Sequence, residues 1–303
     1  MTSDEQPGAA SGPLDAAGAT EAASRPQDEP VDPREPTPAD EATNALWRAR
    51  LLGTDPGLQQ MRRMFGRLPS PPRCKICGAP FHGPGRIFTR LWLRGESPGH
   101  PLICNSCIGS LAKHPGGAEI EISIVFADVR GSTGLAERTS PAEFRALLQR
   151  FYEVSAQAID RNGGIVDKFL GDGVMALFIP VLTGENHASR ALQAARQLLG
   201  GAARLRVAAG VLPVGAGLHT GIAFVGAVGS GDKLDFSALG DTVNVAARLG
   251  SVAAAGELLV SRAAWDATGL PLEGASLREL EVRGRATPLE VIVERPSDVA
   301  ATA

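Results

Sequence analysis

Apolar positions in the C-terminal two-thirds of the chain recur first with the period of a strand and then with that of a helix. Residues 120–127 (IEISIVFA) are predicted to form a strand that ends at Asp128. After the small-residue loop RGSTG, we expect a helix with Pro141 in its first turn, where a missing N–H costs nothing. The apolar residues of this helix fall three and four positions apart and form one stripe, made of Phe144, Leu147, Leu148, Phe151 and Val154.

A β-hairpin is predicted next, because a Gly-Asp-Gly turn separates two apolar runs at 165–170 and 173–179. The later elements are a helix at about 186–200, strands in GAGLHTG and IAFVGAVG, a helix at 241–253, a strand at 257–261 and a closing hairpin at 277–294. This order, β-α-β-β-α-β with extra C-terminal strands, is that of ferredoxin-like sheets. The expected fold class is therefore α+β with a split βαβ arrangement.

In such a sheet the first strand lies beside the hairpin, so Asp128 and Asp172 are expected to meet. Two close carboxylates repel unless a cation lies between them, and hard oxygen ligands favour magnesium or manganese. The RGST loop beside them opens a helix, and backbone N–H groups at a helix start can face a phosphate. These features suit a nucleoside triphosphate held by two metal ions.

Charge is distributed unevenly, although the formal net charge of the 303 residues is only −3. Residues 1–41 hold ten acids and two arginines among many Ala, Pro, Gly and Ser. Such a segment buries too little apolar surface to offset the entropy lost on ordering, so a disordered acidic arm is predicted. Residues 42–113 hold eleven Lys and Arg against two acids. A basic segment can bind nucleic acid, but the acidic arm is an alternative partner, and nucleic-acid binding is not favoured.

All four cysteines lie in one short region, as two CxxC pairs separated by twenty-six residues. Pairs at this separation can bring four thiolates around a tetrahedral zinc ion, and an iron–sulfur cluster is the alternative. A closed four-thiolate site has no open position for chemistry. Residues 42–117 are therefore predicted to be a basic helical segment with a zinc-binding-like module that organises or regulates catalysis. The expected ligands are Cys74, Cys77, Cys104 and Cys107, with His82, His100 and His114 nearby.

The N-terminus is acidic and has no apolar stretch like that of a secretory signal. The longest uncharged run, residues 207–231, is interrupted by Pro213, His219 and many glycines, which indicates two strands rather than a membrane span. We therefore expect a cytoplasmic protein without a membrane span. His219 is expected to have a structural role.

Four segments in this region carry a family resemblance. FADVRGST, KFLGDGVMALF, GLHTGIAFVGAVG and FSALGDTVNVAARL together resemble the class III adenylyl/guanylyl cyclase catalytic domain, in the family's order and at its spacing. The resemblance covers residues 118–295 and leaves 296–303 as a tail. It implies that the 3′-hydroxyl of ATP attacks the α-phosphorus, which gives cyclic AMP and pyrophosphate. It also implies two Mg²⁺ or Mn²⁺ ions per site and a homodimer whose sites each draw residues from both subunits.

The resemblance assigns metal and phosphate roles to several residues. Asp128 and Asp172 match the metal-binding aspartates, and Val129 would add its backbone carbonyl. The amides of Ser132 and Thr133 match positions that bind the β- and γ-phosphates.

Residues nearer the C-terminus match the ribose- and phosphate-binding positions. Asn244 and Arg248 lie four apart, hence on one helix face, and match the residues that position the ribose and stabilise charge on the α-phosphate. Asp241 is expected to cap their helix. Arg283 falls where a phosphate-binding lysine is usual, and it keeps the charge but not the geometry of lysine.

Two residues match the positions that read the purine. Lys168 matches the lysine of adenylyl cyclases, whose ammonium can donate to adenine N1, whereas guanylyl cyclases carry glutamate there. Ser237 replaces the aspartate of many members and comes near the threonine of a subgroup associated with bicarbonate stimulation. Its neutral hydroxyl can accept from the adenine amino group but discriminates less. The predicted function is an adenylate cyclase in intracellular signal transduction. The alternatives are a guanylate cyclase, or a catalytically silent nucleotide-sensing or zinc-centred interaction protein.

Overall fold

The computed structural model describes eight stretches of the chain: residues 38–68, 72–91, 94–97, 102–113, 116–207, 210–230, 233–281 and 287–295. Most of the predicted acidic arm, Arg283 and the C-terminal tail at 296–303 lie outside the described residues. Residues 37–303 form one unit.

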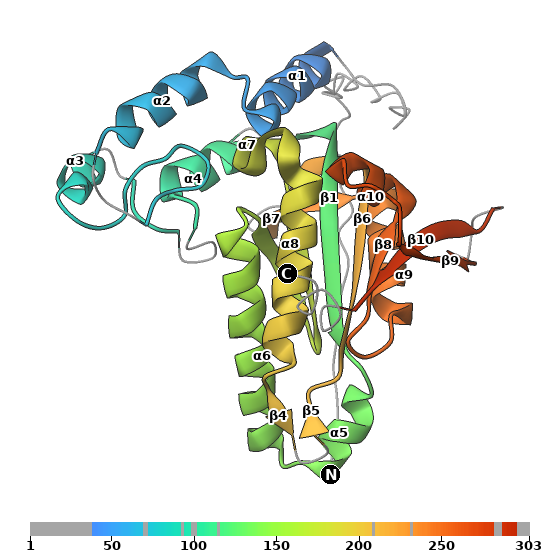
Figure 1. The fold of residues 1–303 in the computed structure, drawn as a ribbon. Coiled ribbons are helices and arrows are strands. Elements are labelled where there is room, and N and C mark those ends of the chain that lie inside the picture. Colours follow the sequence, from blue (N-terminus) through green and yellow to red (C-terminus); the bar gives the residue numbers. More distant parts are fainter. Residues whose placement is uncertain are drawn as a thin grey trace, which may run out of the picture. The chain divides into compact units, whose positions relative to one another are not determined.

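A mixed sheet lies at the centre of this unit (Figure 1). Its strands are β1 (Gly117–Val129), β2 (Ile165–Leu170), β3 (Gly173–Phe178), β6 (Val214–Ser230), β7 (Lys233–Leu239), β8 (Leu258–Ser261), β9 (Ser276–Leu280) and β10 (Leu289–Glu294). They are ordered β2-β3-β1-β6-β8-β10-β9, and β7 pairs with β6. Because β1 lies between the hairpin and β6, antiparallel to both, the predicted ferredoxin-like arrangement is confirmed.

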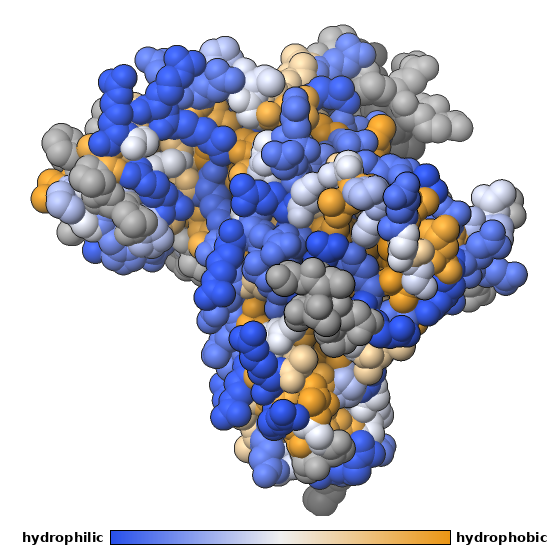
Figure 2. Space-filling view, viewed as in Figure 1, coloured by the Kyte–Doolittle hydropathy of each residue, from blue (hydrophilic) through white to orange (hydrophobic). Residues whose placement is uncertain are grey.

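One face of the sheet is covered by α6 (Pro141–Arg161) and α8 (His187–Ala202), which lie next to each other in Figure 1. The Ser140 side chain and Glu143 form a capping box that starts α6, so the helix begins where the sequence predicts it. Alternate residues of β1, such as Val125 and Ala127, pack under these helices. The outer face of α6 is hydrophilic in Figure 2, as expected for a helix with a single buried stripe.

The other residues of β1 face the N-terminal region. Ile122 and Ile124 share a core with Trp47 of α1 (Pro38–Leu52) and with Phe65 of α2 (Pro56–Gly66). Thus the four-cysteine region and the sheet are stabilised by the same apolar cluster. The remaining helices are α3 (Gly85–Leu91), α4 (Asn105–Lys113), α5 (Ser132–Arg138), α7 (Pro180–Thr183), the 3₁₀ helix η1 (Gly184–Asn186), α9 (Asp241–Val252) and α10 (Arg262–Thr268), and a short hairpin comprises β4 (Arg206–Val207) and β5 (Gly210–Val211).

The prediction of two strands in GAGLHTG and IAFVGAVG was wrong, because one continuous strand, β6, spans both segments. Its glycines do not interrupt the strand; they let a helix approach it. A Cβ atom on Gly217 would lie 2.2 Å from the backbone nitrogen of Gly250 in α9, and one on Gly215 would lie 2.6 Å from the carbonyl of Ala253. The glycines that resembled strand breaks therefore position α9 against the sheet.

The predicted capping role of Asp241 was also wrong. Gly240 occupies the N-cap position of α9, with φ of 127°, and Asp241 is the first helical residue. The backbone at position 240 favours glycine, so the aspartate falls one position later. Its negative carboxylate still lies at the positive end of the helix dipole, where it stabilises the helix.

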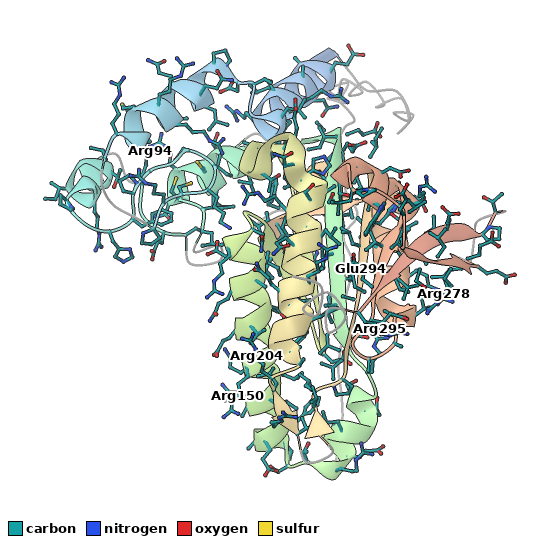
Figure 3. All side chains as sticks on the ribbon, viewed as in Figure 1. Arg94, Arg150, Arg204, Arg278, Glu294 and Arg295 are labelled. Carbon is teal, nitrogen blue, oxygen red and sulfur yellow. The ribbon has the colours of Figure 1, made fainter. Side chains whose placement is uncertain are left out.

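Beyond α9, a buried carboxylate ties the C-terminal strands together. Glu257 is 1% exposed and accepts two hydrogen bonds from Arg278 of β9, at 2.7 and 3.1 Å, and one from Arg295 at 3.4 Å. The two arginines are labelled in Figure 3. Burial alone would raise the pKa of Glu257, but the hydrogen bonds from Arg278 and from the backbone of Ala254 outweigh it and lower this pKa.

We expect Glu257→Gln to lower the free energy of unfolding by about 2 kcal/mol at neutral pH, because it removes charge-assisted hydrogen bonds from a buried group. The lowered pKa of the folded state means that this stabilisation is present above the ordinary pKa of 4.5 and is lost as the pH falls through the folded-state value. Urea unfolding from pH 7 to pH 3 measures it. The control Glu290→Gln, in an exposed pair with Arg262, should change the free energy of unfolding much less, because solvent screens an exposed ion pair. Equal effects of the two variants would contradict the prediction.

Candidate active site

The two aspartates predicted to bind metal lie next to each other at one end of the sheet. Asp128 lies opposite Gly173 in the β1–β3 pairing, and the backbone N–H of Val129 donates to the carbonyl of Asp172 over 3.1 Å. Burial raises the pKa of Asp128, and the Asp172 carboxyl raises it further, against the effect of Arg130. The pairing of β1 with the hairpin therefore creates a repulsive carboxylate pair that a divalent cation would relieve.

Arg130 is a residue of this site for which the sequence predicts no role. Its guanidinium lies 2.6 Å from Asp128 Oδ2 and also donates to the carbonyls of Gly250, at 2.9 Å, and Ser251 at the end of α9. A guanidinium thus already pairs with one oxygen of Asp128, and a metal ion bound at that oxygen would have to displace it. The only signal in the sequence is an arginine two positions after the strand-end acid.

The hairpin turn that carries Asp172 is held from α6. The hydroxyl of Tyr152 donates to the carbonyl of Gly171, and its ring packs on Phe169 with centroids 4.3 Å apart. Gly171 has φ of 66°, which a side chain would disfavour. α6 therefore holds the hairpin directly before the candidate metal ligand Asp172.

The two residues predicted to read the purine also come together. Lys168 Nζ lies 3.1 Å from Ser237 Oγ, which links β2 to β7. A third residue, Asp167, completes the cluster: its Oδ2 lies 3.0 Å from Ser237 Oγ and 3.2 Å from Lys168 Nζ. Asp167 is not predicted from the sequence to join Lys168, because neighbours in a regular strand point to opposite faces.

A β-bulge explains how Asp167 reaches this cluster. In the β2–β3 pairing, Val166 lies opposite Ala176 and Lys168 opposite Met175, so Asp167 has no partner of its own. The extra residue turns the strand locally and lets two consecutive side chains approach one serine. The pattern of apolar and polar residues in β2 does not predict the bulge.

The other predicted residues occupy the starts and faces of two helices. Ser132 and Thr133 are the first two residues of α5, whose first N–H groups have no partner within the helix. Asn244 and Arg248 are both exposed on α9, whereas the residues that follow them, Val245 and Leu249, are buried. A Cβ on Gly250 would lie 2.8 Å from Phe126 Cβ, so α9 is seated closely on β1.

The four cysteine sulfur atoms all lie within 4.8 Å of one another. Cys77 Sγ is 3.7 Å from Cys104 Sγ, and Cys74 Sγ is 4.0 Å from Cys107 Sγ. Sulfur atoms around a tetrahedral zinc at about 2.3 Å stand about 3.8 Å apart, so the four thiolates can hold one such ion. A multi-iron cluster would separate them further, because irons and sulfides lie between its ligands.

Cationic groups surround this cluster. Arg94 Nη1 lies 3.4 Å from Cys77 Sγ, and the guanidinium stacks over Phe65. Burial lowers the pKa of Arg62, and the neighbouring cysteines oppose that shift. A metal bound by four thiolates carries net negative charge, which these arginines would balance.

The cysteine module binds the catalytic region through backbone carbonyls and through an ion pair of Lys75 with Asp160 of α6. Arg62 donates to the carbonyl of Val181, while Lys75, between the first two cysteines, donates to the carbonyl of Gly164 at 2.6 Å. Gly164 directly precedes β2, the strand of Asp167 and Lys168.

A second contact between the two regions is aromatic. Trp47 stacks on Phe236, with centroids 6.4 Å apart and planes 11° apart, and Phe236 directly precedes Ser237. The module therefore contacts both strands of the predicted purine-reading cluster, just before β2 and at the residue before Ser237 in β7.

The described helices include none that combines the length and apolarity needed to cross a bilayer. His219 is buried, and its Nδ1 lies 2.7 Å from Ser261 Oγ, in agreement with its expected structural role.

Solved structures of cyclases share this fold. The guanylyl cyclase Cya2 is 26% identical with a TM-score of 0.55, over 59% of this chain and 93% of that one. The adenylyl cyclase CyaB from P. aeruginosa is 24% identical with a TM-score of 0.51, over 58% of this chain and 94% of that one, which supports the fold alone.

Curated relatives point the same way. An adenylate cyclase of Anabaena cylindrica is 35% identical over 132 residues, which are 42% of this chain and 26% of the relative. Adenylate cyclase 1 of Rhizobium meliloti is 32% identical over 134 residues, 43% of this chain and 20% of the relative. The chain thus spans about a quarter of the length of these relatives. Residues 118–294 match the adenylate and guanylate cyclase catalytic domain, which confirms the predicted resemblance. By this match over more than half of its length, the chain belongs to the adenylate and guanylate cyclase catalytic domain family.

Proposed function

We propose that this chain is an adenylate cyclase that converts ATP to 3′,5′-cyclic AMP and pyrophosphate and acts in intracellular signal transduction. The observation that carries the choice of ATP is the pair of Lys168 Nζ and Ser237 Oγ, 3.1 Å apart. An ammonium only donates, which suits adenine N1, and a hydroxyl can accept from the adenine amino group. Guanine presents an N–H and a carbonyl at the same two positions.

The donor set supports a site for two Mg²⁺ or Mn²⁺ ions. Asp128 and Asp172 supply carboxylate oxygens, Val129 supplies a backbone carbonyl, and Arg130 now neutralises one of these oxygens. When bound, the ions would lower the pKa of the 3′-hydroxyl and neutralise the triphosphate. They would replace the Arg130 contact to Asp128 Oδ2.

The chain's own groups bind and orient the nucleotide. The amides of Ser132 and Thr133 at the start of α5 bind the outer phosphates. Asn244 positions the ribose, and the guanidinium of Arg248 stabilises the negative charge that develops on the α-phosphate. Arg283, outside the described residues, would add a further phosphate contact.

A homodimer completes the site in this proposal, since cyclase domains act as dimers. Large apolar side chains are exposed on β2, β6, β7 and α9, the elements that would meet a second subunit, and Ile222 is 65% exposed. They are Phe169, Leu170, Ile222, Leu239 and Val252. In each site Asp128 and Asp172 of one subunit would face Lys168, Asn244 and Arg248 of the other.

The four-cysteine module is proposed to hold a structural zinc ion and to regulate catalysis. The distances between the sulfur atoms support a single tetrahedral ion. The contacts of Lys75 and Trp47 beside the purine-reading cluster support the regulatory role.

The test is turnover by the purified full chain with ATP or GTP and either Mg²⁺ or Mn²⁺, with the cyclic nucleotides separated by chromatography. We expect cyclic AMP and an equal amount of pyrophosphate. Faster formation of cyclic GMP would establish the guanylate cyclase alternative, which the similarity to Cya2 keeps in view. If the protein is folded and dimeric but forms neither cyclic AMP nor cyclic GMP, the hypothesis of a catalytically silent nucleotide-sensing protein would be favoured.

A further inference from the structure

We propose that Asp167 is a positioning residue that sets the purine preference of the site by orienting the hydroxyl proton of Ser237. The inference rests on the proposed adenylate cyclase function and adds a residue that no cyclase motif quoted above assigns. Its basis is a buried carboxylate in contact with both purine-reading side chains.

Asp167 is placed for this role and has no other evident one. Its side chain is fully buried, Oδ2 lies 3.0 Å from Ser237 Oγ and 3.2 Å from Lys168 Nζ, and Oδ1 has no hydrogen-bond partner among the residues that the structure describes. A carboxylate purely for packing would be costly at such a position, because burying an acid with one unsatisfied oxygen is unfavourable. The β-bulge at this residue is a local distortion that brings it to the serine.

The donor and acceptor inventory of the cluster fixes the direction of its hydrogen bonds. A carboxylate only accepts and an ammonium only donates, whereas a hydroxyl has one proton and two lone pairs. The Ser237 hydroxyl must therefore donate to Asp167, while Lys168 donates to the serine oxygen. Burial raises the pKa of Asp167, and the charge of Lys168 opposes this shift by stabilising the carboxylate.

The consequence is that Ser237 can only accept from a bound base. An unconstrained serine could rotate its proton and donate to the 6-carbonyl of guanine as easily as it accepts from the 6-amino group of adenine. When Asp167 holds its proton, the serine oxygen can accept a hydrogen bond from the 6-amino group of adenine but cannot donate one to the 6-carbonyl of guanine. Many family members carry an aspartate, a pure acceptor, where this chain has Ser237. Asp167 and Ser237 together would thus act as a pure acceptor in the same way.

The experiment compares ATP with purine riboside triphosphate, which lacks only the 6-amino group, and with GTP. In the unmodified chain, kcat/KM for ATP should exceed that for purine riboside triphosphate by about tenfold to a hundredfold, the usual effect of one hydrogen bond to a buried acceptor. In Asp167→Asn, whose amide can donate to the serine, this ratio should fall close to one, and the ratio of GTP to ATP turnover should rise at least about tenfold.

Two further variants separate positioning from a structural effect. Ser237→Ala should give the same loss of preference, and adding Asp167→Asn to it should change nothing more. Moving the carboxylate, in Asp167→Asn combined with Ser237→Asp, should restore the preference for ATP. Asp235→Asn is the matched control, because Asp235 also places charge near Asp167 but hydrogen-bonds to the Phe236 backbone, and it should leave the ratio unchanged.

If the ratio of ATP to purine riboside triphosphate turnover stays the same in Asp167→Asn, even when both activities fall, the inference is overturned while the proposed function stands. Calorimetric binding of the corresponding 3′-deoxynucleoside triphosphates, which cannot cyclise, gives the same ratio without turnover. Absence of any cyclic product from the unmodified chain would therefore refute the proposed function separately, and the binding ratio would still decide the role of Asp167.

Discussion

Asp128→Ala and Arg248→Ala, each inactive alone, are expected to recover about a quarter of the unmodified rate when mixed in equal amounts. The proposed homodimer has two sites, and each takes its metal ligands from one subunit and its Arg248 from the other. Random exchange makes about half of the dimers mixed, and a mixed dimer has one intact site and one site that lacks both groups. Each single variant should lose on the order of a hundredfold or more in kcat, because it removes a group that stabilises transition-state charge.

The decisive control mixes Asp128→Ala with Asp172→Ala. Both residues belong to the same half of the site, side by side at the end of the sheet, so every mixed dimer still lacks a metal ligand in each site. This mixture should stay inactive. Cyclic AMP production by the pure and mixed proteins, after dimer exchange is verified by size-exclusion chromatography of tagged subunits, measures the effect. Recovery in both mixtures, or in neither, would contradict sites shared in this way.

The adjacency behind this experiment could be predicted from the sequence. A strand, a helix and a hairpin in that order leave few sheet topologies, and each of them places the end of β1 beside the hairpin turn. Asp128 and Asp172 therefore meet for topological reasons, whatever the details of packing. The pairing of Lys168 with Ser237 followed from the family resemblance and lies on the same sheet.

Features that depend on a single backbone irregularity could not be predicted. Alternation of residue types assigns Asp167 and Lys168 to opposite faces, and only the bulge places both against Ser237. The glycines of β6 resemble breaks by composition, yet they serve the approach of α9. Glycine is compatible both with a strand break and with close packing of a helix on a strand, so the sequence alone does not tell which of the two occurs.

The docking of the cysteine module was equally hidden. Apart from the ion pair of Lys75 with Asp160, its contacts from Arg62 and Lys75 to the catalytic region reach backbone carbonyls, those of Val181 and Gly164, and every residue has such a group. Sequence patterns cannot single out such acceptors. The structure thus joins a module predicted as separate to the strand that carries Lys168, the lysine proposed to read the purine, and by this contact a metal bound in the module would act on the proposed active site.

Cys77→Ser is expected to abolish metal binding by the module and to lower both its stability and the cyclase rate. A structural zinc site contributes on the order of 10 kcal/mol to the folding of its domain, so its loss should release the loop that carries Lys75 and the contact of that residue to Gly164. The start of β2 and the stack of Trp47 on Phe236 would then lose support on either side of Lys168 and Ser237. Displacements of about 1 Å in an active site can cost on the order of a hundredfold in rate, so we expect a loss of at least about tenfold.

Elemental analysis, thermal unfolding and initial rates of the same preparations measure these effects together. The matched control is Ser106→Ala, which lies between Cys104 and Cys107 and supplies no thiolate, and it should keep full metal content and rate. Zinc gives no visible absorption, whereas an iron–sulfur cluster is coloured, so a spectrum identifies the metal. Because magnesium is supplied in excess, removal of the cysteine-bound metal by a chelator acts on the module alone, and rezincation should restore the rate. A metal-free Cys77→Ser protein with unchanged melting temperature and rate would show that the contacts of Lys75 and Trp47 transmit nothing to catalysis.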